Sequence, residues 1–169
     1  MELSFGPNGT LIVDDARIAG GSYRNFEGRA SKFNREGDRS FALILPNQEI
    51  VDMLVADVNE YGNAWNVKIR APKEEGDEPF MFLPVKVKFN EWGPKVYLKS
   101  GESVIQLDEE TVGMLDDIDI SSVDMEIAPS DRIVTGKPYR TAYLRSIWVT
   151  QYIRNDDRFA SRFAEHNAQ

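Results

Sequence analysis

Alternating apolar and polar residues along most of the chain predict short β-strands. In WNVKIR at residues 65–70, the apolar side chains fall on one face and Asn66, Lys68 and Arg70 on the other. The same alternation predicts strands at 82–89, 95–99 and 123–127, and the long final strand is expected at 139–153. Turn residues separate these segments, as in a protein built mainly from antiparallel β-structure.

One internal segment instead has helical spacing. Asn47 is a good N-cap, apolar residues recur from Ile50 to Tyr61, and Gly62 can end the helix. We therefore expect an inserted helix at about 47–61. In the tail, Phe159 and Phe163 lie four residues apart, which indicates a short amphipathic helix that could dock on the protein or on a second copy.

These patterns predict a mainly β fold, a closed or partly open barrel or a sandwich, with one inserted helix and a short C-terminal helix. The 169 residues contain no internal repeat and no linker, so one domain at 1–153 followed by a tail at 154–169 is expected.

A basic, aromatic-rich loop between the first two main strands is the first candidate for binding chemistry. Cations and aromatic rings interleave there, and such a loop suits both stacked bases and phosphate oxygens. The alternative is a solvated arginine loop that its phenylalanines hold to the core. The candidate residues are Arg24, Phe26, Arg29, Lys32, Phe33, Arg35 and Arg39.

A second candidate surface is the outward face of the predicted strands. The strands at 82–89 and 95–99 are joined by a tight turn, so we expect them to be hairpin neighbours that collect their lysines on one face. Lysines on a merely solvated sheet are the alternative. The candidates are Lys68, Arg70, Lys86, Lys88, Lys95, Tyr97 and Lys99, with Trp92 in the turn as a stacking platform. Trp148, between Ile147 and Val149, is expected in the core.

Charge is unevenly placed along the chain. The formal net charge is −8, and ten acidic residues with no Lys or Arg stand between Glu102 and Asp131. Between Ala16 and Phe41, however, six cations face three anions. A local basic patch decides which ligand approaches, so an acidic total does not exclude nucleic acid. The acidic block is interpreted as conferring solubility.

Several classes of protein find no support. The chain has no cysteine for disulfides or thiolate metal sites, no apolar run that could span a membrane and no signal-peptide pattern at its N-terminus, so a cytoplasmic protein is expected. Its one histidine, His166, lies in the tail, and no catalytic motif is visible. The acidic cluster at 116–119 lacks the spacing of a calcium loop. We expect no enzyme activity, no cofactor and no metal.

Several motifs resemble a family of tailed-phage and prophage single-stranded DNA-binding proteins. They are RNFxG at 24–28, KFNxxGxRxF at 32–41, WNVKIR at 65–70, FLPVKVKF at 82–89 and AYLRSIWVT at 142–150. The resemblance implies an oligonucleotide-binding (OB) fold that coats single strands in replication or recombination with little sequence preference. It places binding positions in the loop, at Arg24, Arg29, Lys32, Arg35 and Arg39, and also at Lys86 and Lys88. The mixed-charge tail and the early helix depart from the better-known phage members.

The first hypothesis is thus a non-enzymatic phage protein that binds single-stranded DNA, works in the host cytoplasm, and has replication or recombination proteins or further copies of itself as other candidate partners. The alternative is a structural or interaction protein, such as a small β-sandwich virion component or a modulator of a host factor; a metal-dependent nuclease comes third. Within the first hypothesis we expect the loop to matter more than the sheet face, because a loop can close over a flexible strand.

Overall fold

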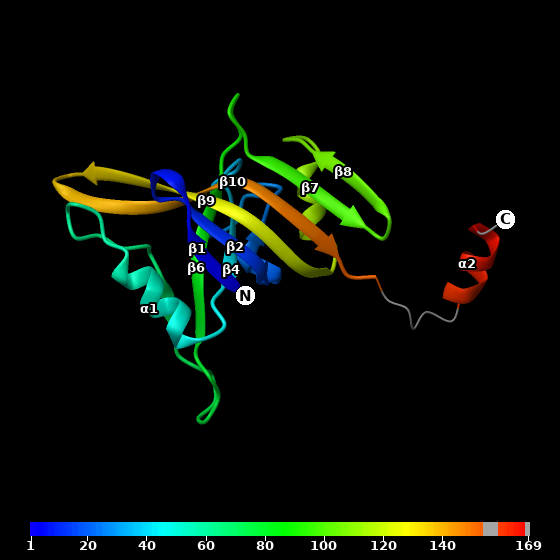
Figure 1. Cartoon of the computed structure of the whole chain (residues 1–169), viewed down its shortest axis with the longest axis horizontal. Coiled ribbons are helices and arrows are strands. Elements are labelled where there is room, and N and C mark those ends of the chain that lie inside the picture. The colour runs from blue at the N-terminus through cyan, green and yellow to red at the C-terminus, as the bar shows by residue number, and fades with distance from the viewer. Residues whose placement is uncertain (154–158, 168–169) are drawn as a thin grey trace.

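The computed structural model describes residues 1–153 and 159–167, and most of its regular structure is strand (Figure 1). The mainly β prediction is confirmed. The elements are β1 (Glu2–Phe5), β2 (Leu11–Ala16), β3 (Arg24–Asn25), β4 (Arg39–Ile44), α1 (Gln48–Ala56), β5 (Lys68–Arg70), β6 (Phe80–Val87), β7 (Lys95–Ser100), β8 (Ser103–Leu107), β9 (Ile120–Val134), β10 (Lys137–Gln151) and α2 (Ala160–Asn167). Short 3₁₀ turns lie at Pro7–Gly9, Gly21–Tyr23 and Val112–Asp116. None of the helices in these ranges is long and apolar enough to cross a membrane.

The strands form one sheet with the order β1-β2-β9-β10-β6-β4-β3, with β5 on β6, β7 on β10 and β8 on β7. This ladder order does not return to its start, so within the described residues the sheet is not closed. After β2 the chain turns toward β4, where Ile18 forms an isolated antiparallel β-bridge with Leu43. The inward residues of the central strands bury one continuous core, including Leu43, Val85 and Ile147.

The predicted hairpin between the strands at 82–89 and 95–99 is wrong. Both strands pair in parallel with β10 instead: β6 at Ala142 and Tyr143, and β7 from Ser146 to Thr150. They therefore lie end to end along one side of β10. The turn between them closes on itself between Asn90 and Gly93, and the Pro94 that follows has no N–H to donate to β6. The lysines of β6 and β7 are spread along β10 and are not gathered on one hairpin.

The inserted helix is present but shorter than the predicted range 47–61. Asn47 caps it by accepting a hydrogen bond from the Ile50 N–H, and α1 ends at Ala56. Asp57 leaves the helical conformation, and its carboxylate accepts the indole N–H of Trp65 at 2.8 Å. This side-chain bond fixes the chain after the helix.

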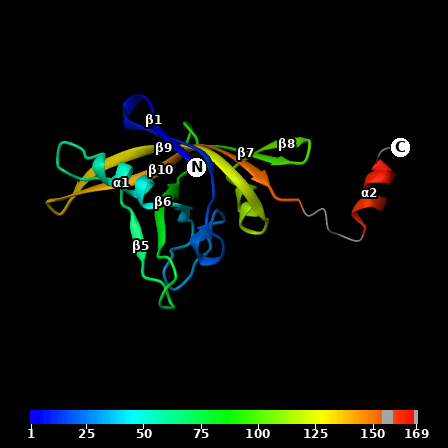
Figure 2. The same ribbon diagram turned by 60° about the horizontal axis from the view of Figure 1, so that its bottom comes forward.

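The hairpin of β9 and β10 is the longest feature of the sheet, with fifteen residues in each strand. It extends beyond the neighbouring strands on the side where α1 lies (Figures 1 and 2). In the tail, residues 160–167 form α2, in which Phe163 is exposed. Residues 154–158 and 168–169 of the predicted tail lie outside the described residues, and docking of the tail stays a prediction.

Candidate nucleic-acid interface

The basic loop between β3 and β4 is held by its own side-chain amides. Asn25 Oδ1 accepts the backbone N–H groups of Gly28 and Arg29, both at 2.9 Å. Asn34 Nδ2 donates to the carbonyls of Arg29, Arg35 and Asp38. Gly28, at φ 77°, approaches the backbone of Gly37 so closely that a Cβ would lie 3.1 Å from it. The loop therefore has a defined structure of its own.

The acidic segment that follows β8 anchors this loop. The two carboxylate oxygens of Asp116 accept the backbone N–H groups of Phe26 and Glu27, at 2.8 and 3.0 Å. In return, Arg24 donates to the carbonyls of Leu115 and Ile118. Burial lowers the pKa of Arg24, while Asp116 and Asp119 oppose that shift. The acidic block therefore has a structural role, whereas the sequence analysis interpreted it only as conferring solubility.

The same segment neutralises two further loop arginines. Arg29 pairs with Asp117 at 3.7 Å, and Arg39 pairs with Glu109 at 3.3 Å while its guanidinium lies over the Phe89 ring. Lys32, Phe33 and Arg35 remain exposed. Three of the five predicted loop cations are therefore already engaged by the protein.

Phe26 was wrongly predicted to be a nucleic-acid-binding residue. Its ring is fully buried and stacks on Phe41 with the centroids 5.1 Å apart, so it has no face to offer a base. Phe33 is the opposite case. It stands in a tight turn closed between Ser31 and Asn34, and 92% of its surface is exposed.

A second tight turn presents Trp92 in the same manner. It is closed between Asn90 and Gly93, with Asn90 Oδ1 accepting the Trp92 N–H at 2.8 Å, and Trp92 is 85% exposed. An exposed aromatic ring beside positive charge can serve as a stacking platform for a base. Trp92 is consistent with the predicted platform.

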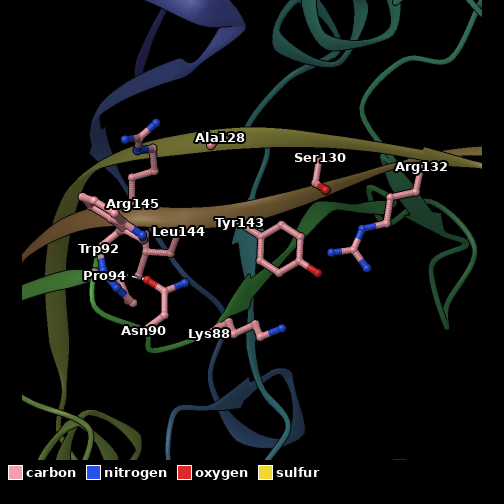
Figure 3. Close-up of a pocket in the computed structure, with 11 residues that line it drawn as sticks. Lys88, Asn90, Trp92, Pro94, Ala128, Ser130, Arg132, Tyr143, Leu144 and Arg145 are labelled. Atoms are coloured by element: carbon pink, nitrogen blue, oxygen red, sulfur yellow. Dashed lines mark hydrogen bonds between the residues drawn. The ribbon is translucent and has the colours of Figure 1, made fainter.

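Beside Trp92, three adjoining cavities run over the outward side of β6, β9 and β10. The central cavity, of about 320 Å³, includes Lys88, Trp92, Arg132, Tyr143 and Arg145 in its lining. Figure 3 shows Tyr143 near Lys88 and Arg132, with Trp92 at the end of the cavity opposite Arg132.

The other two cavities adjoin the central one. The loop cavity, of about 410 Å³, lies toward the basic loop, and the hairpin cavity, of about 600 Å³, lies toward α1. Tyr143 lines all three, while Lys86, Lys88 and Arg132 each line two. The three cavities therefore form one continuous concave surface around Tyr143.

The cations of the central and hairpin cavities differ from those of the loop. Among the residues that the structure describes, no carboxylate lines either cavity. Within the part of the chain that the structure describes, none of their cations except Arg140 forms an ion pair. We call this surface the sheet track; it consists of Lys68, Lys86, Lys88, Trp92, Arg132, Tyr143 and Arg145.

Arg140 has a different role, because it braces the β9–β10 hairpin. Its side chain is almost fully buried and donates to both carboxylate oxygens of Asp131, at 2.8 and 3.2 Å, and to the carbonyl of Asp57. Its guanidinium also lies over the Trp65 ring, 5.2 Å from the centroid. The hydrogen bond from Arg140 lowers the pKa of Asp131. This network fixes the strands that carry Arg132 and Tyr143.

Three residues of the sheet track were missed by the sequence interpretation: Arg132, Tyr143 and Arg145. Alternation could not place Tyr143 and Arg145 outward, because they share the parity of the buried Ile147 and Val149. The pairing of β10 with β9 shifts register between Leu144 and Ser146, and this irregularity puts Tyr143 on the outward face. Arg132 gave no signal either, because both sides of the hairpin near its tip are exposed.

The remaining predicted residues lie apart from this surface. Arg70 is on β5, over the Phe82 ring. Lys95, Tyr97 and Lys99 face outward on β7, where Tyr97 contacts Trp148 with the ring centroids 6.0 Å apart. Trp148, expected in the core, is 38% exposed, because it alternates with the buried Ile147 and Val149. The cavity there is lined by three carboxylates, those of Asp14, Asp124 and Glu126.

The predicted absence of a metal site was based on the acidic cluster at 116–119. Among the described residues, no group of three or more His, Asp or Glu side chains is arranged to hold a metal ion. Asp116 instead serves the backbone of the basic loop, as described above.

Comparisons with known proteins agree with a nucleic-acid surface. Residues 4–168 match the family model described as "Putative phage ssDNA-binding domain". Among solved structures, the chain is similar to the single-stranded DNA-binding protein from bacteriophage Enc34, with 15% identity, a TM-score of 0.51, and 98% of this chain and 99% of that chain covered. The complex of that protein with ssDNA gives 15% identity, a TM-score of 0.50, and coverage of 88% and 89%. No curated protein matches the chain. At this identity the structural likeness concerns the fold.

Proposed function

Because the chain belongs to the phage ssDNA-binding domain family, we propose that it coats single-stranded DNA along the sheet track, without catalysis and with little sequence preference. The observation that carries this proposal is a set of cations around Tyr143 that, within the described residues, have no ion-pair partner and lie in two cavities without a lining carboxylate. A phosphate that enters there meets cations without displacing a protein carboxylate.

The sheet track combines the two contacts that unspecific single-strand binding needs. Lys86, Lys88, Arg132 and Arg145 supply positive charge along the path of a backbone. Tyr143 and Trp92 supply ring faces on which bases of any sequence can stack, at about 1–3 kcal/mol per base. The loop tip, with Lys32, Phe33 and Arg35, adds a secondary contact at the rim.

The fold and the biological setting follow the same family. We infer an elaborated, partly open OB-type barrel, because the chain after β2 pairs with β4 at Ile18 and Leu43 and the fold is similar to that of the bacteriophage Enc34 protein. A role in phage replication or recombination inside the host cytoplasm is the setting that such a protein implies. Replication or recombination proteins, or further copies of this chain, are its candidate partners.

Tryptophan fluorescence tests the proposal directly. Trp65 is buried and Trp148 is partly covered, so Trp92 is the tryptophan most open to solvent. Titration with oligo(dT) at low salt should quench the emission, and Trp92→Phe should remove most of the quenching. The affinity should fall steeply with salt through counterion release. No binding of oligo(dT) at low salt would overturn the proposed function.

A further inference from the structure

Glu109 stands at the border between the acidic segment and the proposed DNA path. Its carboxylate lines the loop cavity together with Lys86, Lys88 and Arg39. It pairs with the Arg39 guanidinium at 3.3 Å, and its backbone carbonyl accepts a second bond from Arg39 at 3.2 Å. The Glu109 side chain is 64% exposed whereas that of Arg39 is 16% exposed, so the carboxylate is the part of the pair that is more accessible to a ligand in the cavity. We propose that Glu109, with the acidic segment behind it, makes the surface selective against duplex DNA.

The segment that carries Glu109 cannot easily withdraw. Asp108 Oδ1 accepts the N–H groups of Glu110 and Thr111 and also the Thr111 hydroxyl. These bonds lower the pKa of Asp108, with the bond from the Thr111 hydroxyl as the largest cause. Farther along, Asp116 and the carbonyl of Leu115 are tied to the basic loop. We call residues 108–119 the acidic wall; the segment carries six carboxylates, and Glu109 is the one that lines the loop cavity.

A fixed negative wall affects single and double strands differently. A single strand is flexible and can place its phosphates on the sheet track while it turns bases toward Glu109. A duplex is stiff and carries one charge per about 1.7 Å of its axis, so its second backbone has no such freedom. Like charges forced together suppress the wrong partner more than they weaken the right one.

The acidic wall also borders the proposed DNA path on one side only. Glu109 and Asp38 line the loop cavity, whereas no carboxylate of residues 1–153 or 159–167 lines the central or hairpin cavity. A strand can therefore run through the last two without meeting negative charge. A second strand beside it, on the side of the loop, would meet Glu109.

This inference rests on the proposed function, and the experiment separates the two. Glu109→Gln and Glu109→Lys would be compared with Glu102→Gln and Glu102→Lys in the full chain. Glu102 belongs to the same acidic block and is exposed, but it lines none of the three cavities. Affinities for oligo(dT) and for a duplex of equal length would be measured at the same low salt. Thermal unfolding would establish that each variant is folded.

We expect wild type to prefer the single strand. Glu109→Gln should lower this preference by about tenfold through tighter duplex binding, Glu109→Lys should lower it further, and the Glu102 variants should leave it within about twofold. Equal gains for both DNA forms, or an unchanged preference in folded Glu109 variants, would overturn the inference while leaving the proposed function intact. A wild type that binds duplex as tightly as single strand would overturn it as well. Failure of wild type to bind oligo(dT) would end both proposals.

Discussion

The basic loop and the sheet track both carry cations, but they differ in what those cations touch. In the loop, Arg24, Arg29 and Arg39 already bind carbonyls or carboxylates of the acidic wall. On the track, Lys86, Lys88 and Arg145 have no ion-pair partner within the described ranges 1–153 and 159–167. The difference teaches that the number of positive residues in a segment is a poor guide to a phosphate-binding surface. What decides is how many of them are left unpaired.

The two regions also differ in their aromatic residues. At the base of the loop, the Phe26 ring stacks on Phe41 of β4 and is buried in the core. The track places Tyr143 at the centre of three cavities and Trp92 at the end of one. We therefore expect the track to form the floor of the site and the loop to form only its rim, which reverses the expectation from the sequence that the loop matters more than the sheet face.

Removing the charge of the track should have the largest effect. In a variant with Lys86, Lys88, Arg132 and Arg145 changed to Ala, four phosphate contacts are lost. The salt slope should fall by about 0.7 per contact, or about 2.8 in total, and affinity at about 0.1 M salt by several hundredfold. A titration of oligo(dT) at several salt concentrations measures both. Lys95→Ala/Lys99→Ala, which removes lysines of the same sheet outside the track, is the matched control and should change little.

Removing the central ring of the track should come next. Tyr143→Ala should weaken oligo(dT) binding by about 5- to 150-fold, the equivalent of about 1–3 kcal/mol of stacking, with the salt slope nearly unchanged. Tyr143→Phe keeps the ring and should bind almost as wild type. Equal loss in both variants would assign the effect to the hydroxyl and would contradict stacking.

Loosening the loop should affect stability more than binding. Asp116→Ala removes the acceptor of two backbone N–H groups and should lower the free energy of unfolding by about 2 kcal/mol. Asp117→Ala, which loses only an exposed pair with Arg29, should cost far less. Chemical denaturation compares them. If Asp117→Ala is as destabilising as Asp116→Ala, the loop is not anchored as described.

Neutralising the loop tip should weaken binding less than removing the charge of the track. Arg29→Ala/Lys32→Ala/Arg35→Ala should reduce the salt slope by about 1.4 at most, and oligo(dT) affinity at about 0.1 M salt by about 25-fold at most, because Arg29 is already paired and only Lys32 and Arg35 are left to contact phosphate. The same salt titrations provide the measurement. A loss as large as that of the track variant would move the principal site to the loop.

Acid should release the brace of the β9–β10 hairpin. The folded-state pKa of Asp131 lies below its ordinary value of 3.8, so the stability from its contact with Arg140 is present above about pH 4 and is lost as pH falls through the folded pKa. Asp131→Asn should therefore be less stable than wild type near neutral pH, with a difference that shrinks in acid. Thermal unfolding between about pH 6 and pH 2.5 would reveal this small effect, and a difference that grows in acid would contradict it.

Local patterns predicted much of the sheet, but not its long-range pairing. The alternation at 82–89 correctly placed Lys86 and Lys88 outward, and Asn47 correctly marked the start of α1. The pairing of β6 and β7 with β10 could not be predicted from the sequence, because the turn between β6 and β7 resembles that of a hairpin. Burial of Phe26 and the pairing of Arg39 with Glu109 depend on residues 15 and 70 positions away. Such contacts leave no local signal.

Photochemical cross-linking of oligo(dT) that contains 5-iododeoxyuridine tests most directly where the strand lies. The halogenated base reacts with an aromatic ring on which it stacks, and mass spectrometry identifies the attached residue. If the sheet track is the DNA path, adducts should form mainly on Tyr143 and Trp92, and an excess of unmodified oligo(dT) should suppress them. Adducts confined to Phe33 of the basic loop, with Tyr143 and Trp92 unmodified, would contradict the central claim.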